Sequence, residues 1–265
     1  MEENRPEDVG VRPDEKYGSD VKMSSPFIKK LDNFWYHYKW HSIFALLGIF
    51  IVLICVLQLC SRQSYDVHLL YAGYYNVDRT QPEGGSLPEY NVLLSSFGRV
   101  GEDFDGDGEI TTSFATHRVM SEAKREELEL STGEYISEGL LTSDRQTLYD
   151  RMLYSEYYLC LLSVEVYEDC MKKFDGDMGG NGIFFVNLEQ YLPEGAEVEY
   201  YGEYKNAIML GSLNFSELAG VCDLPEDTVL CLRFRSGVTS VIDEAQSEEY
   251  YRRSIETLKN ILEME

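Results

Sequence analysis

The sequence predicts an α/β protein: a single transmembrane helix followed by one three-layer-like α/β domain with a mixed sheet. Residues 42–60 form an apolar run without a charged side chain. Apolar, strand-like runs then alternate with helix-forming segments over about two hundred residues, which is enough chain for one sizeable core. We therefore expect a cytoplasmic tail (1–41), a membrane helix (42–61) and an extracytoplasmic domain (62–265).

The apolar run has the length of a membrane span. A helix of nineteen residues is roughly 28 Å long, close to the hydrocarbon core of a bilayer at about 30 Å. The aromatic residues of FWYHYKWH (34–41) would form a belt at the membrane interface. A core helix of a soluble domain is the alternative, but it would need a polar face, and Gln58 is the only clearly polar side chain between Ile43 and Leu59. We expect residues 42–60 to contact the lipid bilayer.

Basic residues near the run predict its orientation. Four lysines lie in the twenty residues before it and two arginines in the twenty after it, which favours a cytoplasmic N-terminus. A cleaved signal peptide has a short N-terminal region, whereas forty-one residues precede this run, and the residues before Cys60 include no small residue next to it as in a lipoprotein signal. The pattern therefore favours an uncleaved anchor in the cell membrane, with the C-terminal domain extracytoplasmic.

The predicted domain is strongly acidic. The whole chain has a formal charge of −24, and residues 61–265 account for −23 of it, with 16 basic and 39 acidic side chains. Such a surface repels phosphate backbones and anionic headgroups, so nucleic acid is excluded as a partner, and cations or basic partners are favoured. The alternative is that the acidity serves solubility alone.

Six cysteines divide between the two parts of the chain. Cys55 and Cys60 belong to the membrane helix, where cysteine acts as a small apolar residue. The other four could form two disulfides in an oxidising compartment, or remain as buried free thiols, since no CxxC occurs. The sequence leaves both alternatives open for Cys160, Cys170, Cys222 and Cys231.

The elements follow from local patterns. Residues 1–26 mix charges with Pro, Gly and Ser and should be disordered. Residues 27–34 are either a short amphipathic helix at the inner membrane surface or the first turns of the membrane helix. Runs rich in apolar and β-branched residues predict the strands 65–73, 110–120, 157–165, 182–188 and 227–235. Helices are predicted at 86–97, 121–130, 143–154, 166–174 and 247–265.

Several positions within these elements carry specific expectations. The nearly unbroken apolar run 157–165 is typical of a central strand. Ser143 and Gln146 have the spacing of a capping box, and Ser247 can cap the final helix. Residues 198–211 are ambiguous and could form two short strands, and a helical turn is expected from Asn214.

One local motif points to a metal. Asp103, Asp105 and Asp107, followed by Gly108 and Ile110, match the first half of a calcium loop, D-x-D-x-D-G-x-I. Alternate carboxylates in a tightly turning loop can converge on one hard cation, and glycine allows the positive φ that the turn needs. Glu109 would contribute its backbone carbonyl. The loop is similar to the calcium loops of EF-hand and dockerin proteins over about eight residues.

The motif lacks the residue that sets affinity. Position twelve, normally a bidentate acid, is Phe114. Glu102, Glu122 and Asp144 are candidates for a replacement carboxylate, and without one we expect a weak Ca²⁺ site. An acidic turn without metal is the alternative. A second cluster, of Asp175, Asp177 and Asn181, is diluted by glycine and is a poorer candidate.

Nothing in the chain specifies a reaction. The sequence contains no GxSxG, HExxH, P-loop or GxGxxG motif. His68 and His117 each fall within a predicted strand, where a lone histidine is more often structural than catalytic. Tyrosines occur in pairs, which favours core packing on one side, with sugar stacking or a protein interface as the alternative. We expect a protein that is not an enzyme.

The order of elements resembles one lobe of an extracytoplasmic solute-binding protein, through YDVHLLYAG (65–73), YYLCLLSVE (157–165) and NGIFFVNLEQYLP (181–193). The whole chain is similar to uncharacterised single-pass membrane proteins of Gram-positive bacteria. The resemblance implies an α/β ectodomain with a binding role. The alternatives are an accessory subunit that contacts a membrane complex through the membrane helix itself, and an enzyme of the cell envelope. An aromatic-lined cleft would favour the first function, an exposed apolar patch the second, and a pocket with a histidine beside a carboxylate the third.

Overall fold

The computed structural model describes residues 26–60, 65–77, 88–175, 184–235 and 243–264. The chain divides into two compact units, Met1–Gln63 and Ser64–Glu265. In the first unit, helix α1 (Pro26–Cys60) includes the segment 27–34, so that segment is helical. Residues Tyr38–Val56 of α1 are long and apolar enough to cross a membrane, and none of that window is buried. The predicted disordered tail, residues 1–25, lies outside the described residues.

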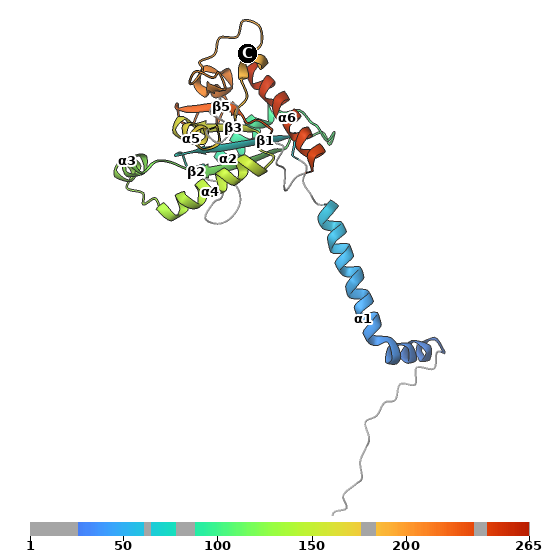
Figure 1. Cartoon of the computed structure of the whole chain (residues 1–265). Helices are drawn as coiled ribbons and strands as arrows, with labels where there is room; N and C mark the ends of the chain where they lie inside the picture. The colour runs from blue at the N-terminus through green and yellow to red at the C-terminus, as the bar shows by residue number, and fades with distance from the viewer. Residues whose placement is uncertain (1–25, 61–64, 78–87, 176–183, 236–242, 265) are drawn as a thin grey trace, which may run out of the picture. The chain divides into compact units, whose positions relative to one another are not determined.

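The second unit is built on a mixed five-stranded sheet, as the sequence predicts (Figure 1). The strand order is β2-β1-β3-β5-β4. Strands β2 and β3 flank β1 and are parallel to it, whereas β5 is antiparallel to β3 and to the edge strand β4. The strands are β1 (Val67–Gly73), β2 (Thr112–Arg118), β3 (Leu159–Ser163), β4 (Ala207–Met209) and β5 (Thr228–Leu232).

Strand β1 is the buried strand around which the sheet is arranged. All seven of its residues are buried, because both of its edges are paired and both of its faces are covered. Leu69 and Tyr71 point into one hydrophobic core, and Leu70 and Ala72 point into the other. Because successive side chains enter cores on opposite faces, nearly every position of the strand must be apolar. The apolar run therefore correctly predicts an internal strand.

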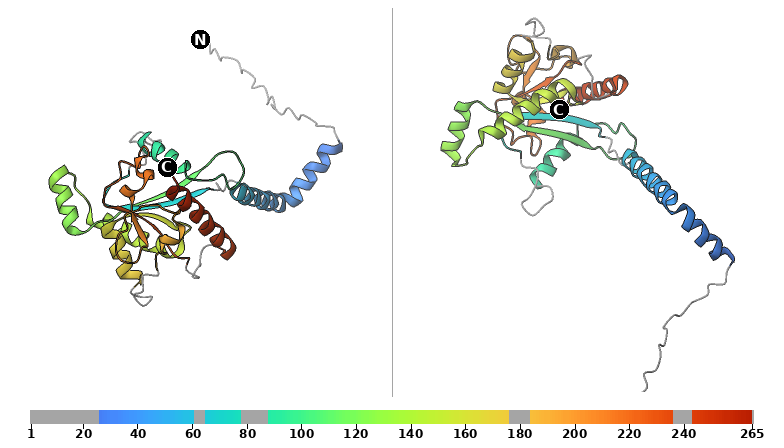
Figure 2. Two further views of the ribbon diagram at one scale, coloured as in Figure 1. Left: turned by 90° about the horizontal axis from the view of Figure 1, so that it is seen from above. Right: turned by 60° about the horizontal axis from the view of Figure 1, so that its bottom comes forward.

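Helices cover both faces of the sheet and give a three-layer arrangement, and Figure 2 shows α2 and α4 on opposite sides. Helices α2 and α6 cover one face through Leu93, Phe97 and Leu258. Helices α4 and α5 cover the other through Leu148 and Val166. The helix bounds are α2 (Pro88–Gly98), α3 (Glu122–Thr132), α4 (Glu138–Tyr154), α5 (Val164–Cys170) and α6 (Glu244–Leu262).

The connections reverse direction at β1. The chain passes from β1 through α2 to β2 on one side, and then returns through α3 and α4 to β3 on the other side. The carboxyl ends of β1 and β3 therefore border a topological switch point, the position at which open α/β sheets bind ligands.

Two predicted helix starts are wrong. Helix α4 begins at Glu138 rather than at Ser143, because Leu141 is among the side chains that it buries. Helix α6 begins at Glu244 with Asp243 at its N-cap. Ser247 is therefore inside the helix and buried, and its hydroxyl lies 2.6 Å from that of Tyr158.

The predicted strand 182–188 is also wrong over its described part. Phe185 forms only an isolated bridge with Arg233, and a 3-10 helix, η2 (Leu188–Tyr191), follows. Of the two short strands left open for 198–211, β4 is one, and Tyr200 contributes only a bridge to Ile208. The turn expected from Asn214 is the 3-10 helix η4 (Asn214–Glu217). The glycine cluster 176–182 lies outside the described residues.

Candidate functional site

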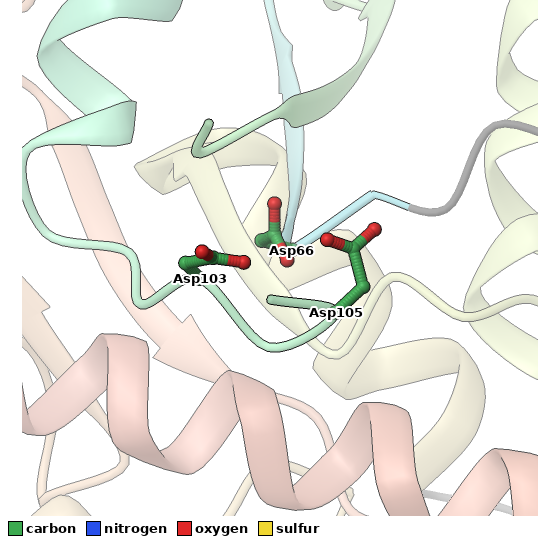
Figure 3. A group of neighbouring side chains, drawn as sticks. All are labelled: Asp66, Asp103 and Asp105. Atoms are coloured by element: carbon green, nitrogen blue, oxygen red, sulfur yellow. The ribbon is translucent and has the colours of Figure 1, made fainter. Parts of the chain in front are cut away.

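Three aspartates from two distant segments meet at the amino end of the sheet. One carboxylate oxygen from each of Asp66, Asp103 and Asp105 lies within 4.8 Å of the other two. Figure 3 shows them gathered where the loop before β2 passes the start of β1. Three carboxylates at this spacing could hold a metal ion.

Asp66 is fixed where β1 begins. Its backbone amide donates to the carbonyl of Thr111 at 3.0 Å. Its carboxylate accepts from the amide of Phe104 at 3.0 Å, and from the amide and hydroxyl of Thr111 at 2.9 and 3.2 Å. With 1 % of its surface exposed, Asp66 is a buried carboxylate whose charge is solvated by the protein rather than by water.

The loop turns around Asp103. The carboxylate of Asp103 accepts from the amides of Gly106 at 2.6 Å and Gly108 at 2.9 Å. These two glycines have φ of +77° and +88°, the left-handed region that the motif predicts for glycine. Backbone hydrogen bonds, that from Gly108 foremost, hold the pKa of Asp103 below its ordinary value. The carboxylate of Asp103 is thus ionised at neutral pH and held in place by its own loop.

The structure brings two of the four predicted ligands together. Asp103 and Asp105 belong to the group of three, whereas Asp107 does not, and its carboxylate accepts from the amide of Glu109 at 2.8 Å. The group consists of side-chain atoms, so the predicted backbone carbonyl of Glu109 stays a prediction. The second predicted cluster has Asp177 and Asn181 outside the described residues.

The missing acid comes from another part of the chain. Phe114 packs in the core against Phe97, with 4.9 Å between ring centroids, and cannot act as a ligand. Glu102, Glu122 and Asp144 are not in the group of carboxylates found among the described residues. Asp66 takes their place. The signal in the sequence is a carboxylate directly before an otherwise apolar strand, a position that a buried and hydrogen-bonded acid can occupy.

The last helix holds the same loop from the other side. The ring of Phe104 lies 4.9 Å from the guanidinium of Arg253 and 5.5 Å from that of Arg252. Arg253 also donates to the carbonyl of Tyr65 at 3.3 Å. Both guanidiniums bind Glu249, and these hydrogen bonds, that from Arg252 first, lower the pKa of Glu249 to about 2. Glu249 therefore partly neutralises the charge of these two guanidiniums.

The two histidines lie in β1 and β2, as predicted. Burial first, and then the charge of Arg253, lower the pKa of His68 to about 4. Its ring packs among Tyr65, Tyr157 and Tyr250 at centroid distances of 6.1, 5.9 and 4.7 Å. His68 is therefore neutral at pH 7 and part of an aromatic cluster. His117 is buried in β2.

The cysteines of the second unit are free thiols. Cys160, Cys170 and Cys231 are buried and Cys222 is exposed. Cys160 and Cys231 stand opposite each other in the β3–β5 pair. The sequence leaves open disulfides or free thiols for these four cysteines, and in the structure they are free thiols.

Comparison with known proteins gives no match to a family model, a curated protein or a solved structure. The resemblance to a solute-binding lobe therefore stays a prediction. The expectation that the protein is not an enzyme also remains to be tested.

Proposed function

We propose that the protein is a membrane-tethered, extracytoplasmic binding domain in which Asp66, Asp103 and Asp105 take up calcium. The observation that carries the calcium site is the convergence of oxygens from two segments that lie far apart in the sequence. Calcium–oxygen distances are roughly 2.3–2.6 Å, so oxygens on opposite sides of one ion stand up to about 5 Å apart. The three carboxylate oxygens all lie within 4.8 Å of one another, which is inside that limit.

A bound cation would join three parts of the domain. Asp66 leads into β1, Asp103 and Asp105 belong to the loop that leads into β2, and Phe104 connects this loop to α6. A cation that neutralises three carboxylates would offset their mutual repulsion and hold the amino end of the sheet together. The role that we propose for calcium is structural support of a binding domain. The alternative of an acidic turn without metal predicts no such stabilisation.

The experiment is thermal unfolding of the full chain in detergent micelles with calcium, with magnesium and with chelator. Extracellular calcium modules bind with dissociation constants of about 10⁻⁴–10⁻³ M, so about 5 mM calcium should stabilise the domain by about 1–2 kcal/mol. Asp105→Asn should abolish the shift, because Asp105 belongs to the group. Asp107→Asn is the matched control in the same loop and should retain it. Equal melting temperatures in calcium and chelator would refute the site.

The membrane tether is supported by α1. The window Tyr38–Val56 has the length and composition of a span, and the excess of lysines before it favours a cytoplasmic N-terminus. The acidity of residues 61–265 suits an exposed domain that meets cations or basic partners.

A second candidate, an accessory subunit of a membrane complex, is favoured by exposed apolar side chains around α3. Helix α3 buries none of its residues, and it projects from the sheet in Figure 1. Leu130, Tyr135 and Leu140 are 88, 83 and 69 % exposed. Exposed apolar side chains mark an interaction surface where they form a contiguous patch. Native electrophoresis of membranes solubilised under mild conditions tests this role: Leu130→Gln/Tyr135→Gln should release the protein from any larger assembly, and unchanged migration as a monomer in both forms would exclude it.

A further inference from the structure

A hollow of about 200 Å³ opens at the carboxyl edge of the sheet, beside the switch point at β1. Three segments form it: the residues that follow β1, the first turns of α2, and the loop before β5. The lining residues are Tyr75, Asn76, Val77, Glu89, Tyr90, Leu93, Gly220, Asp223 and Leu224. Ligands of α/β folds bind at this edge, where the strand order reverses.

The loop before β5 is held tightly against α2. The hydroxyl of Ser96 donates to the carbonyl of Ala219 at 2.7 Å. Gly220 has φ of +81°, and a Cβ at this position would lie 3.0 Å from Cα of Leu93. Only glycine combines that backbone conformation with such a close approach to a helix. The walls of the hollow are therefore fixed relative to each other.

Buried hydroxyl groups lie at the same edge of the sheet. Ser163 ends β3 and stands opposite Thr228, the first residue of β5. They are 1 % and 0 % exposed, and neither hydroxyl oxygen has a hydrogen-bond partner within the described parts of the chain. At Gly73, a Cβ would lie 2.6 Å from Oη of Tyr71, so β1 leaves room there only for this hydroxyl. This edge of the sheet thus has buried hydroxyl groups that make no hydrogen bond within the described structure.

The charge of the lining selects the ligand. Its ionisable groups are the carboxylates of Glu89 and Asp223 and the phenols of Tyr75 and Tyr90, and none of the nine lining residues is basic. The amino end of α2 would attract an anion, but Glu89 in its first turn offsets that dipole. Tyrosine faces attract organic cations. An anionic ligand would meet two carboxylates and no counter-charge among the described lining residues.

The size and the apolar part of the lining narrow the ligand class. Val77, Leu93 and Leu224 offer contacts for an alkyl chain between the polar groups. The volume equals roughly six or seven waters at about 30 Å³ each, which suits an alkylamine of a few carbons. We infer that this hollow binds a small organic ammonium ion, with Glu89 and Asp223 as its counter-charges and Tyr75 and Tyr90 as its aromatic walls.

This inference deepens the binding role proposed above and rests on it, but it does not depend on calcium. Asp66 precedes the first residue of β1, whereas Tyr75 follows the last. The carboxylate group and the hollow therefore lie at opposite ends of the same strand. If an experiment refutes one of the two proposed sites, the other can still be tested independently.

The experiment is isothermal titration of the full chain, in nanodiscs of uncharged lipid, with 1,4-diaminobutane. The neutral 1,4-butanediol is the matched ligand control. We expect the diamine to bind and the diol to bind at least about tenfold more weakly. Asp223→Asn should weaken diamine binding about tenfold, as should Tyr75→Leu, which provides a second test if the first variant unfolds. Glu126→Gln removes an exposed charge on α3 and should leave binding unchanged.

Three outcomes would overturn the inference: no heat of binding with the diamine, equal affinities for diamine and diol, or an equal loss in Glu126→Gln and Asp223→Asn. The last outcome would mean that the amine follows the overall charge of the domain. The titration is repeated with Asp105→Asn. If that variant binds the diamine normally while calcium no longer stabilises it, the two sites are independent. If calcium stabilises the wild type and the diamine never binds, the hollow is refuted and the calcium site stands.

Discussion

The backbone amide of Phe104 donates a hydrogen bond of 3.0 Å to Oδ1 of Asp66. The other oxygen of this carboxylate accepts from the amide of Thr111 at 2.9 Å. Asp66 therefore ties the loop before β2 to the start of β1 before any cation binds. Its structural contribution and its proposed contribution to a metal site can be separated by comparison with Asp105, whose carboxylate accepts a hydrogen bond within its own loop, from the amide of Asp107 at 3.2 Å.

Asp66→Asn should destabilise the domain even in chelator. The substitution places an amide group where both carboxylate oxygens now accept, so a buried donor would face a backbone donor. We expect a loss of about 1–3 kcal/mol in the free energy of unfolding. Asp107→Asn, in the exposed part of the loop, should stay within about 0.5 kcal/mol of the wild type. Urea unfolding of the full chain in micelles measures both, and equal stability of Asp66→Asn and wild type would contradict the role of Asp66.

The stability of the domain should fall with pH in a window set by His68. The pKa of His68 is about 4 in the folded state and 6.5 in the reference state, so below pH 6.5 the unfolded chain binds a proton that the folded chain does not. The contribution of neutral His68 to the free energy of unfolding is fully present above pH 6.5 and is lost progressively toward pH 4. At pH 5 the loss should be about 2 kcal/mol.

His68→Phe supplies the control for this pH dependence. Phenylalanine can pack among the neighbouring tyrosines but does not titrate. Urea unfolding between pH 7.5 and 5 measures how the free energy of unfolding changes with pH. We expect this change to be smaller in the variant than in the wild type. Parallel slopes would show that His68 is as easily protonated in the folded domain as in the unfolded chain.

Gly220→Ala should destabilise the fold by about 1–3 kcal/mol, because alanine is disfavoured at φ of +81° and its Cβ would press on Cα of Leu93. Gly211→Ala is the matched control, since a Cβ at Gly211 would have open space around it and the backbone there does not have a positive φ. Thermal unfolding compares the two. Equal effects would mean that the loop can move away from α2.

The cysteines should divide sharply by reactivity. Burial raises the pKa of the Cys170 and Cys231 thiols, which suppresses the reactive thiolate, whereas Cys222 is exposed. Within the domain, a maleimide should label Cys222 in the native protein, and Cys160, Cys170 and Cys231 only after denaturation. Peptide mapping by mass spectrometry reads this out. If Cys160 and Cys231 remain unlabelled in denaturant until a reductant is added, they form a disulfide in the protein as isolated.

The exposed thiol of Cys222 also reports the membrane topology. With a membrane-impermeant maleimide, intact cells should label the wild type at Cys222 if the domain is extracytoplasmic. Cys222→Ser should lose this label, which separates it from any label on Cys55 or Cys60. Labelling that requires cell lysis would place the domain in the cytoplasm and overturn the proposed orientation.

The sequence predicts the sheet well where burial dictates pattern. Segments 65–73, 110–120, 157–165 and 227–235 contain β1, β2, β3 and β5, because strands buried on one or both faces need continuous or alternating apolar residues. The run 182–188 has the same character but is not a strand in its described part. Phe184 and Phe185 are both buried through ring packing rather than through a ladder, with ring centroids 4.9 Å apart. Apolar content alone does not distinguish these cases.

The site is half predictable for a different reason. Asp103 and Asp105 belong to a local loop whose spacing and glycines are visible in the sequence. Asp66 joins them only because β1 and β2 pair in parallel, with Val67 opposite Thr112. When strand pairing brings a ligand residue in from a distant segment, the sequence contains no short motif that would reveal it. The amine hollow, which combines three segments, is hidden for the same reason.

The position of β1 has a consequence for how the protein folds. Leu69 pairs with Phe114 on one side and with Leu159 on the other, so β1, the first strand after the candidate membrane helix in the sequence, needs partners that are made later. Such long-range pairing slows folding and leaves a seven-residue apolar strand open to wrong contacts in the meantime. During synthesis, β1 would stay unpaired until first β2 and then β3 have been made, and chaperones that hold unfolded chains would be expected to protect it during that interval.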